Sequence, residues 1–465
     1  MAHERLSITD TMFLALEGPD TPQNIGFLAI FEGAPLVGPD GRFRIDHVVD
    51  FVRGTVHGFA PFRHRILPVP FGLGRPVWID HAEFDVANHV RAETLAAPTR
   101  AALLARAGEF FAEPLGLDLP PWDILFLDGL PDGHVALLSK THHAAIDGAS
   151  AMAGFRTMAS FDPEPRPVVP PQPWTPAPVP SKAALVAGAL AHQVRHAGKL
   201  ARLAGRAIVA PRRAVDRARR AARAAAPFLR DRAPVPPLSI NRRVGPRRRL
   251  ATVALSLDDA KRIRAVLGGT VNDVLVAAVA GGLRHLLHER GELAPGVAAT
   301  VMCPVSTREE GQIEAGNQVG ALTVTVPLDL DDPVARFHEV TAATQRAKTD
   351  DPAADLDFVA GLFDFMVPAM QRRAARSVHE QQGYNLTVSN LAGVPIPMWF
   401  QGARLLELYP VVPVGGYVGV NVVGLSNCGR LFVSLTADAD ANPDLDVFAL
   451  GIEAAFGELL VAASP

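Results

Sequence analysis

A proline-rich segment and the basic segment that follows it divide this chain near its middle. Residues 163–180 contain too many prolines for a helix or a central strand, because proline lacks the amide donor that both structures need. The segment Lys182–Arg249 carries 18 Lys and Arg against two acids, although the whole chain has a formal charge of only −3. A length of 465 residues also exceeds what one hydrophobic core usually serves. We therefore predict a first domain over residues 1–170, a connector over 171–245 and a second domain over 246–465.

The basic part of the connector should be helical. Ser181 is a predicted N-cap, the residues after it are rich in Ala, Leu and Arg, and Pro211 interrupts the pattern before Pro227 ends it. Spacings of three and four residues would place these side chains along one stripe: Arg195, Lys199, Arg202, Arg206, Arg213, Arg217 and Arg220. This 195–220 basic stripe is either the solvated face of a connector or a surface for anionic lipid headgroups. Nucleic acid is disfavoured as a partner, since no aromatic residues alternate with the arginines.

Both domains should mix helices with strands. Strands are predicted at 26–32, 135–140, 251–255, 322–326, 386–389, 418–423 and 431–437. Helices are predicted at 101–111, 149–160, 272–287 and 334–348. The chain thus belongs to the mixed α/β (α+β) class of folds.

Composition excludes several classes of protein. Hydrophobic residues make up 48% of the chain, which is too many for a disordered protein. The long apolar stretch 408–429 contains two prolines, several glycines and two asparagines, so it predicts buried strands and turns, not a membrane-spanning helix. The opening MAHERLSITD lacks the apolar core of a signal peptide. Two cysteines cannot build a disulfide framework or a four-cysteine zinc site, so we expect a reducing, cytoplasmic location.

The densest chemical cluster is His142-His143-Ala-Ala-Ile-Asp147-Gly148, which follows a predicted strand and precedes a predicted helix. A neutral histidine at such a turn could act as a general base toward a hydroxyl group. Asp147 could orient a histidine ring, or pair with a distant arginine and hold the turn rigid. A metal site is disfavoured, because adjacent histidine side chains diverge and no third ligand stands at zinc spacing. The unreactive alternative is a pair of hydrogen-bonded histidines in a core turn.

The pattern HHxxxDG is the signature of the CoA-dependent acyltransferase superfamily, and other segments extend the resemblance over nearly the whole chain apart from the connector. The chain is similar to the bacterial wax ester synthase/diacylglycerol acyltransferases in LSITDTMFLALE (6–17), GRPVWIDHAEFDVANHV (74–90), PPWDILFLDGL (120–130), TVNDVLVAAVAGGLR (270–284), PVSTR (304–308), GNQVG (316–320), SNLAGVP (389–395) and QGARLLELYPV (401–411). Departures from the family pattern, at 23–26, His81, Pro121 and Ser426-Asn427, lie outside HHxxxDG and bear more on substrate choice than on activity.

The resemblance implies two halves that each resemble chloramphenicol acetyltransferase, with an active-site tunnel between them. It implies His143 as the catalytic base and His142 as support for its loop. Asp147 would be mainly architectural and paired with an arginine, for which Arg308 is the candidate. Gly148 would allow a tight turn or the close passage of substrate. Asn272 would either donate a hydrogen bond to the developing oxyanion or cap the helix that it begins.

The implied activity is transfer of an acyl group from acyl-CoA to diacylglycerol or a long-chain fatty alcohol, giving triacylglycerol or wax ester. Acyl-CoA is then a substrate, and neither a cofactor nor a metal is needed. Two alternatives remain: an enzyme of the same superfamily with another donor or acceptor, such as a carrier-protein thioester or a polyketide alcohol, and a non-catalytic lipid-binding paralogue. Products that partition into lipid suggest peripheral association with the inner membrane or with lipid droplets.

If the stripe meets anionic lipid, removing the charges of Arg195, Arg202, Arg213 and Arg217 should weaken binding to anionic vesicles, because each charge contributes about 1 kcal/mol near such a surface. Cosedimentation at low salt measures the effect, and binding that does not change would assign the stripe to solvent.

Overall fold

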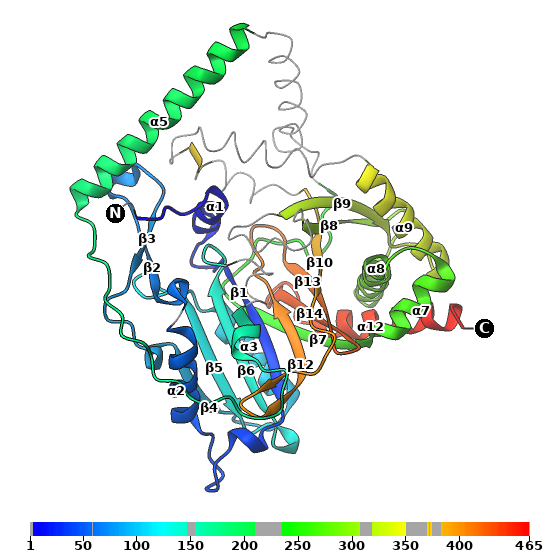
Figure 1. The fold of residues 1–465 in the computed structure, drawn as a ribbon. Helices are drawn as coiled ribbons and strands as arrows, with labels where there is room; N and C mark the ends of the chain where they lie inside the picture. Colours follow the sequence, from blue (N-terminus) through cyan, green and yellow to red (C-terminus); the bar gives the residue numbers. More distant parts are fainter. Residues whose placement is uncertain are drawn as a thin grey trace.

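Two six-stranded sheets and the helices beside them form the molecule (Figure 1). The computed structural model describes residues 3–57, 59–146, 154–209, 235–306, 319–349, 370–371, 373 and 383–464. This architecture confirms the predicted mixed α/β class.

The first sheet has the strand order β11-β12-β1-β6-β5-β4. Its strands are β1 (Asn24–Phe31), β4 (Val90–Thr94), β5 (Trp122–Asp128), β6 (Val135–His142), β11 (Trp399–Phe400) and β12 (Ala403–Val411). All neighbours are antiparallel except β4 and β5. Helices α1 (Ile8–Leu16), α2 (Ile45–Val56) and α3 (Arg100–Ala112) belong to the same half, together with the small hairpin of β2 (His64–Leu67) and β3 (Val77–Asp80).

The second sheet has the strand order β7-β14-β13-β10-β8-β9. Its strands are β7 (Arg248–Ser256), β8 (Ala298–Ser306), β9 (Val319–Pro327), β10 (Leu386–Ala392), β13 (Val420–Asn427) and β14 (Arg430–Asp438). Helices α7 (Leu257–Leu267), α8 (Val271–Glu289), α9 (Pro333–Thr349) and α12 (Leu445–Ala462) accompany it. The run Val274–Leu283 of α8 is buried throughout, since the helix lies in the middle of the main apolar core of this half.

The two halves are joined by more than the connector. Strands β11 and β12 come from the C-terminal part of the sequence, yet β12 pairs with β1 and so completes the first sheet. An apolar cluster then spans both halves, with Leu28, Leu103, Leu250, Tyr409 and Phe432 among its members. The predicted boundaries place residues 399–411 in the second domain, and no local pattern in the sequence indicates that β12 joins the first sheet.

The proline-rich part of the connector packs against the first half. Just before it, Ser160 forms a bridge with Trp399; within it, the amide of Ala177 donates a hydrogen bond to Asp80 at 2.8 Å. The guanidinium of Arg63 lies 4.4 Å from the ring centroid of Trp174. These contacts make the segment a strap over the first half and not an independent linker.

After the strap comes the long helix α5 (Lys182–Val209), whose start at the Ser181 N-cap was predicted: Ser181 Oγ accepts from the amide of Ala184 at 3.2 Å. Of the basic stripe, Arg195 is described and exposed. The side chains of Lys199, Arg202 and Arg206, and residues Arg213, Arg217 and Arg220 altogether, lie outside what the structure describes.

The predicted strands at 26–32, 135–140, 251–255, 322–326, 386–389 and 431–437 and the helices at 101–111, 272–287 and 334–348 are confirmed within a few residues. The strand predicted at 418–423 begins two residues later, at Val420. Only residues 154–158 of the helix predicted at 149–160 are described as helical. The stretch 408–429 forms β13, the end of β12 and the turn between them, as predicted. Among the described helices, none alone has the length and apolar composition to cross a bilayer; α7 and α8 meet that test only as a pair, bent by 98°.

The two cysteines lie in opposite environments. Cys303 on β8 is buried, and burial raises the pKa of its thiol to about 12, with Asp273 adding to the shift. Cys428 is exposed in the turn between β13 and β14, at a positive φ of 45°.

We therefore predict that one thiol of the native protein reacts with a thiol reagent at pH 8, because only an exposed cysteine offers thiolate to the reagent. Both thiols should react after unfolding in urea. Rapid reaction of both thiols in the native protein would contradict the packing around β8.

Candidate active site

The two histidines lie at the end of a central strand. Strand β6 runs between β1 and β5 and ends at His142, which is paired across the sheet with Asn24. The amide of His142 donates to Pro121 O at 2.9 Å, and that of His143 donates to Gln23 O at 2.7 Å. The backbone of this histidine turn is thus held from both sides. Because Gln23 contributes its carbonyl, the departure from the family pattern at this position leaves the contact intact.

His142 is completely buried and its ring has a defined tautomer. The amide of Ala144 donates to Nδ1 at 3.0 Å, so Nδ1 carries no proton. The neutral ring therefore bears its proton on Nε2, which faces Oε2 of Glu17 at 3.1 Å. A fully buried ring whose Nδ1 already accepts a backbone amide is not placed to take a proton from a substrate, and the supporting role expected for His142 stays a prediction.

His143 differs from His142 in being only half-buried. Its imidazole stacks on the ring of Phe13, with the centroids 3.6 Å apart and the planes 10° from parallel. Phe13 contacts the face of the imidazole and so fixes the plane of the ring. The ring nitrogens, where a proton would be transferred, lie at the edge and are not covered by this stack. If the ring takes up a proton, the π-face of Phe13 also favours the cation that forms, as aromatic faces do for other cations.

Helix α1 supplies both of these contacts. Ser7 and Asp10 form a capping box at its start: Ser7 Oγ accepts from the Asp10 amide at 3.0 Å, and Asp10 Oδ2 accepts from the Ser7 amide at 3.0 Å. Phe13 and Glu17, four residues apart, lie on the same face of the helix. The motif at residues 6–17 thereby gains a physical meaning: it begins the helix and presents a ring and a carboxylate to the histidine turn.

Sequence reasoning quoted this motif but did not assign a role to Phe13 or Glu17. Their spacing was the available signal, since it predicts a shared helix face. What that face contacts depends on tertiary structure, because 125 or more residues separate these side chains from the histidines.

Asn272 is the second residue of α8. The cap of this helix is Thr270, whose Oγ1 accepts from the amide of Asp273, while Asp273 closes a capping box onto the amide of Thr270 at 2.8 Å. Helix capping, one of the two roles considered for Asn272, is therefore performed by Thr270. Asp147, Gly148 and Arg308 lie outside the described residues, so the ion pair expected between Asp147 and Arg308 stays a prediction.

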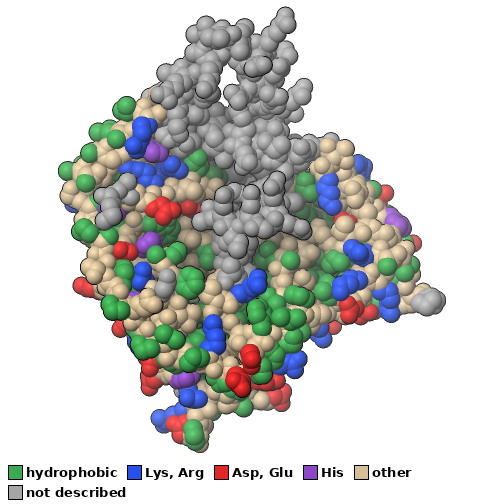
Figure 2. Space-filling model, viewed as in Figure 1, with side chains coloured by type: hydrophobic (Ala, Val, Ile, Leu, Met, Phe, Trp, Pro, Cys, Tyr) green, Lys and Arg blue, Asp and Glu red, His purple; other side chains and the backbone are tan. Residues whose placement is uncertain are grey.

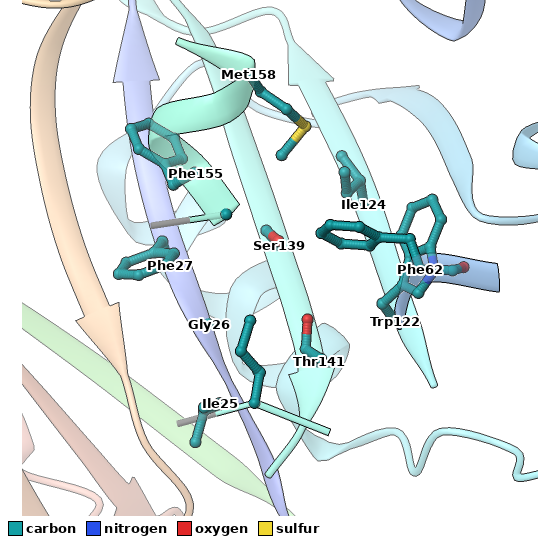
Figure 3. Close-up of a pocket in the computed structure, with 12 residues that line it drawn as sticks. Ile25, Gly26, Phe27, Phe62, Trp122, Ile124, Ser139, Thr141, Phe155 and Met158 are labelled. Carbon is teal, nitrogen blue, oxygen red and sulfur yellow. The ribbon is translucent and has the colours of Figure 1, made fainter. Parts of the chain in front are cut away.

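An apolar cavity adjoins the histidine turn within the first half (Figure 3). It encloses about 450 Å³, part of which is open to solvent. Thr141 and Ile146, which flank the histidine turn in sequence, both line it. The other lining residues are mostly apolar and come from β1, β5, β6, the short helix Ala60–Arg63 and residues 154–158: Ile25, Gly26, Phe27, Phe62, Trp122, Ile124, Ser139, Gly154, Phe155 and Met158. The lining is that of a site for a mainly apolar ligand.

The wall of this cavity is rigid at Trp122, which sequence reasoning treated only as packing. Its Nε1 donates to Phe62 O at 2.8 Å, and its ring stacks on that of His89 at a centroid distance of 4.4 Å. Burial lowers the pKa of His89, so the ring beside Trp122 is kept neutral. The tunnel that the resemblance implies between the halves stays a prediction. Among the described residues, no three His, Cys, Asp or Glu side chains gather as a metal-binding cluster.

The Glu17–His142 contact leads to a stability prediction. Glu17→Leu should lower the free energy of unfolding by about 0.5–1 kcal/mol, because the buried ring of His142 loses the carboxylate that lies 3.1 Å from its Nε2. Glu17→Gln keeps a carbonyl acceptor and should cost less. Urea denaturation measures both, with Glu83→Leu at an exposed position as the control. A Glu17→Leu protein as stable as the control would show that the carboxylate does not support the ring.

Comparison with known proteins places this geometry in a family. The model of the wax ester synthase/diacylglycerol acyltransferase catalytic domain matches residues 6–275, and that of the family's C-terminal domain matches residues 315–460. A relative from Mycobacterium tuberculosis (strain ATCC 25618 / H37Rv), named "Putative diacyglycerol O-acyltransferase Rv0221", is 30% identical over 99% of this chain and 96% of its own.

Solved structures show the same fold. The wax ester synthase/diacylglycerol acyltransferase from Marinobacter aquaeolei VT8 superimposes with a TM-score of 0.72 at 22% identity, covering 99% of each chain. A mutant starter condensation domain of rhizomide synthetase, in complex with C8-CoA and Leu-SNAC, has a TM-score of 0.56 at 14% identity and covers 100% of this chain and 95% of its own. Both domain models match in order along one chain with the expected fold, and we conclude that the protein belongs to the wax ester synthase/diacylglycerol acyltransferase family of acyltransferases.

Proposed function

We propose that this protein transfers the acyl group of an acyl-CoA to the hydroxyl of diacylglycerol or a long-chain fatty alcohol, with His143 as general base. The observation that carries the proposal is the environment of His143: a half-buried ring, fixed by Phe13, at a turn whose flanking residues line an apolar cavity. That combination suits a reaction in which a lipid hydroxyl must lose a proton away from bulk water.

The reaction follows from the chemistry of the two substrates. A ring nitrogen of His143 accepts the hydroxyl proton while the alcohol oxygen forms a bond to the thioester carbonyl carbon. The tetrahedral adduct then collapses with cleavage of the C–S bond, giving the ester and the CoA thiolate. The imidazolium of His143 returns its proton to that sulfur, so CoA leaves as the thiol and the histidine is neutral again.

Neighbouring groups prepare the ring for this cycle. Phe13 holds its plane and stabilises the transient cation by about 0.5–2 kcal/mol. The Glu17–His142 pair keeps the preceding residue buried and immobile, so the position of His143 does not depend on substrate. Rigid support of this kind matters because misplacement of a catalytic group by 1 Å costs about a hundredfold in rate.

The other residues named from sequence complete the proposal. Asn272, freed from capping by Thr270, would donate a hydrogen bond to the oxyanion of the adduct. Asp147 would pair with Arg308 and hold the turn, and Gly148 would let the chain turn tightly beside the substrate.

The cavity would receive an alkyl chain. Among the described residues that line it, most are aliphatic or aromatic and none is charged, which fits the methylenes of an acyl group or a fatty alcohol better than a peptide or sugar. Acyl-CoA as donor is supported by the family and by the condensation domain of the same fold whose complex contains C8-CoA.

The test is thiol release from palmitoyl-CoA with hexadecanol or diolein as acceptor. His143→Ala should lower the rate about 10²–10⁴-fold, the contribution typical of general base catalysis, while circular dichroism shows a native fold. His134→Ala is the matched control, because His134 lies at the start of the same strand and is expected to keep full activity.

Equal ester formation by His143→Ala and the unaltered protein would refute the mechanism. Transfer from an acyl-carrier protein but not from acyl-CoA would favour the alternative donor. No transfer from either donor would favour the non-catalytic paralogue.

A further inference from the structure

The tip of the β2–β3 hairpin and the first turns of α5 together form one surface. Leu185 and Ala189 of α5 pack with Val69, Val77 and Ile79 of the hairpin in a separate apolar cluster. At the tip, Gln193 Nε2 donates to Leu73 O at 2.6 Å. We call this surface the hairpin–helix face; Figure 1 shows α5 extending from it, away from both sheets.

Large apolar side chains project from this face into solvent. Phe71 is 92% exposed, Val194 71% and Leu190 48%. Leu190 and Val194 are four residues apart, so they share one side of α5. Water contact of this extent is unfavourable for large apolar side chains, and the turn at residues 70–72 that carries Phe71 packs against α5. Apolar exposure of this kind usually marks a binding surface.

Phe71 is held outward at a further cost. Its backbone, in the short helix η3 (Pro70–Gly72), has φ 58° and ψ 10°, the left-handed region that bulky residues rarely adopt. Gly72 occupies the next position, and a glycine at position 71 would adopt this conformation without strain. A strained backbone that displays a phenyl ring to solvent serves no purpose in the isolated fold, which points to a partner for the ring.

Basic groups lie on the same hairpin and helix as these apolar side chains. Arg5 Nη1 donates to Arg75 O at 3.3 Å, and the guanidinium of Arg75 lies 3.4 Å from His192 of α5. Burial lowers the pKa of Arg5, and the positive charges of Arg75 and Arg195 lower it further, so the three guanidiniums gather in one place. Helix α5 contains five Lys and Arg and no acid. Figure 2 shows blue and purple side chains among green ones at the upper left, over this region.

We propose that the hairpin–helix face docks on the surface of an anionic phospholipid bilayer. Phe71, Leu190 and Val194 would enter the boundary between headgroups and acyl chains, while the arginines contact lipid phosphates. A small free anion would bind the arginines but would not contact the exposed phenyl ring, so it would leave that ring unexplained.

The same hairpin connects this face to the active site. Ile66 of β2 packs with Leu6 and with Ala144, the residue after His143. Arg5 forms a bridge with Val77 of β3, immediately before the segment that leads into α1. Docking through the hairpin would therefore hold the histidine turn close to a membrane in which diacylglycerol is dissolved. This last consequence rests on the proposed function, whereas docking itself does not.

The experiment is cosedimentation of the full chain with vesicles of equal parts phosphatidylcholine and phosphatidylglycerol, and with vesicles of phosphatidylcholine alone. The double variant Phe71→Ser/Val194→Ser should reduce partitioning about tenfold on both, because two inserted apolar side chains are lost. Arg195→Glu should reduce it about tenfold on the anionic vesicles only. Val266→Ser and Val461→Ser are matched controls, since these valines are 60% and 76% exposed on α7 and α12 of the other half.

Partitioning of the double variant equal to that of the unaltered protein would overturn the proposal, as would failure of the unaltered protein to bind anionic vesicles. His143→Ala should bind like the unaltered protein. Binding is measured without substrate, so loss of catalysis and loss of docking are distinguishable. Transfer to butanol in vesicle-free buffer should be the same for the double variant and the unaltered protein, which excludes damage to the active site.

Discussion

The active-site geometry depends on how one buried ring is held. His142 accepts a hydrogen bond at Nδ1 from the backbone and faces the carboxylate of Glu17 with Nε2, so its tautomer and orientation are both determined. The amides of His142 and His143 donate to Pro121 O and Gln23 O, and these bonds hold the backbone where it leaves the strand. His143 is then presented to the ring of Phe13. Helix α1 thus fixes the orientation of the imidazole at the end of this strand. The chemistry we propose requires such a fixed ring.

The scaffold behind this turn is rigid because the two halves share a core. Strand β12 lies in the first sheet, and α3 is held to both halves: Arg100 donates to Glu407 of β12 at 2.7 Å and to Thr252 of β7 at 2.9 Å. The apolar cluster around Leu103 continues the contact into β7 and β14. An enzyme that must exclude water from an acyl transfer gains from halves that do not separate freely.

Local sequence patterns were enough to predict the strands and helix starts, because these depend mainly on residues close together in the chain. The alternation along 251–255 and 431–437 predicted strands, and Ser181 predicted the start of α5. The pairing of Glu17 with His142 and the crossing of β12 were beyond such reasoning, since both join segments more than 100 residues apart. Trp122 was missed for a related reason: a single aromatic residue in a strand has the same pattern whether it faces a core or a cavity. The cap at Thr270 is a further case: the sequence analysis considered Asn272 for this role, and the geometry shows that Thr270, two residues earlier, performs it.

The most direct test of the account is a crystal structure with an unreactive thioether analogue of palmitoyl-CoA and with hexadecanol. We predict that the alcohol oxygen lies within about 3.2 Å of a ring nitrogen of His143. One alkyl chain should occupy the cavity beside Phe27 and Phe155. An alcohol bound away from His143, or two chains that both lie outside the cavity, would contradict it.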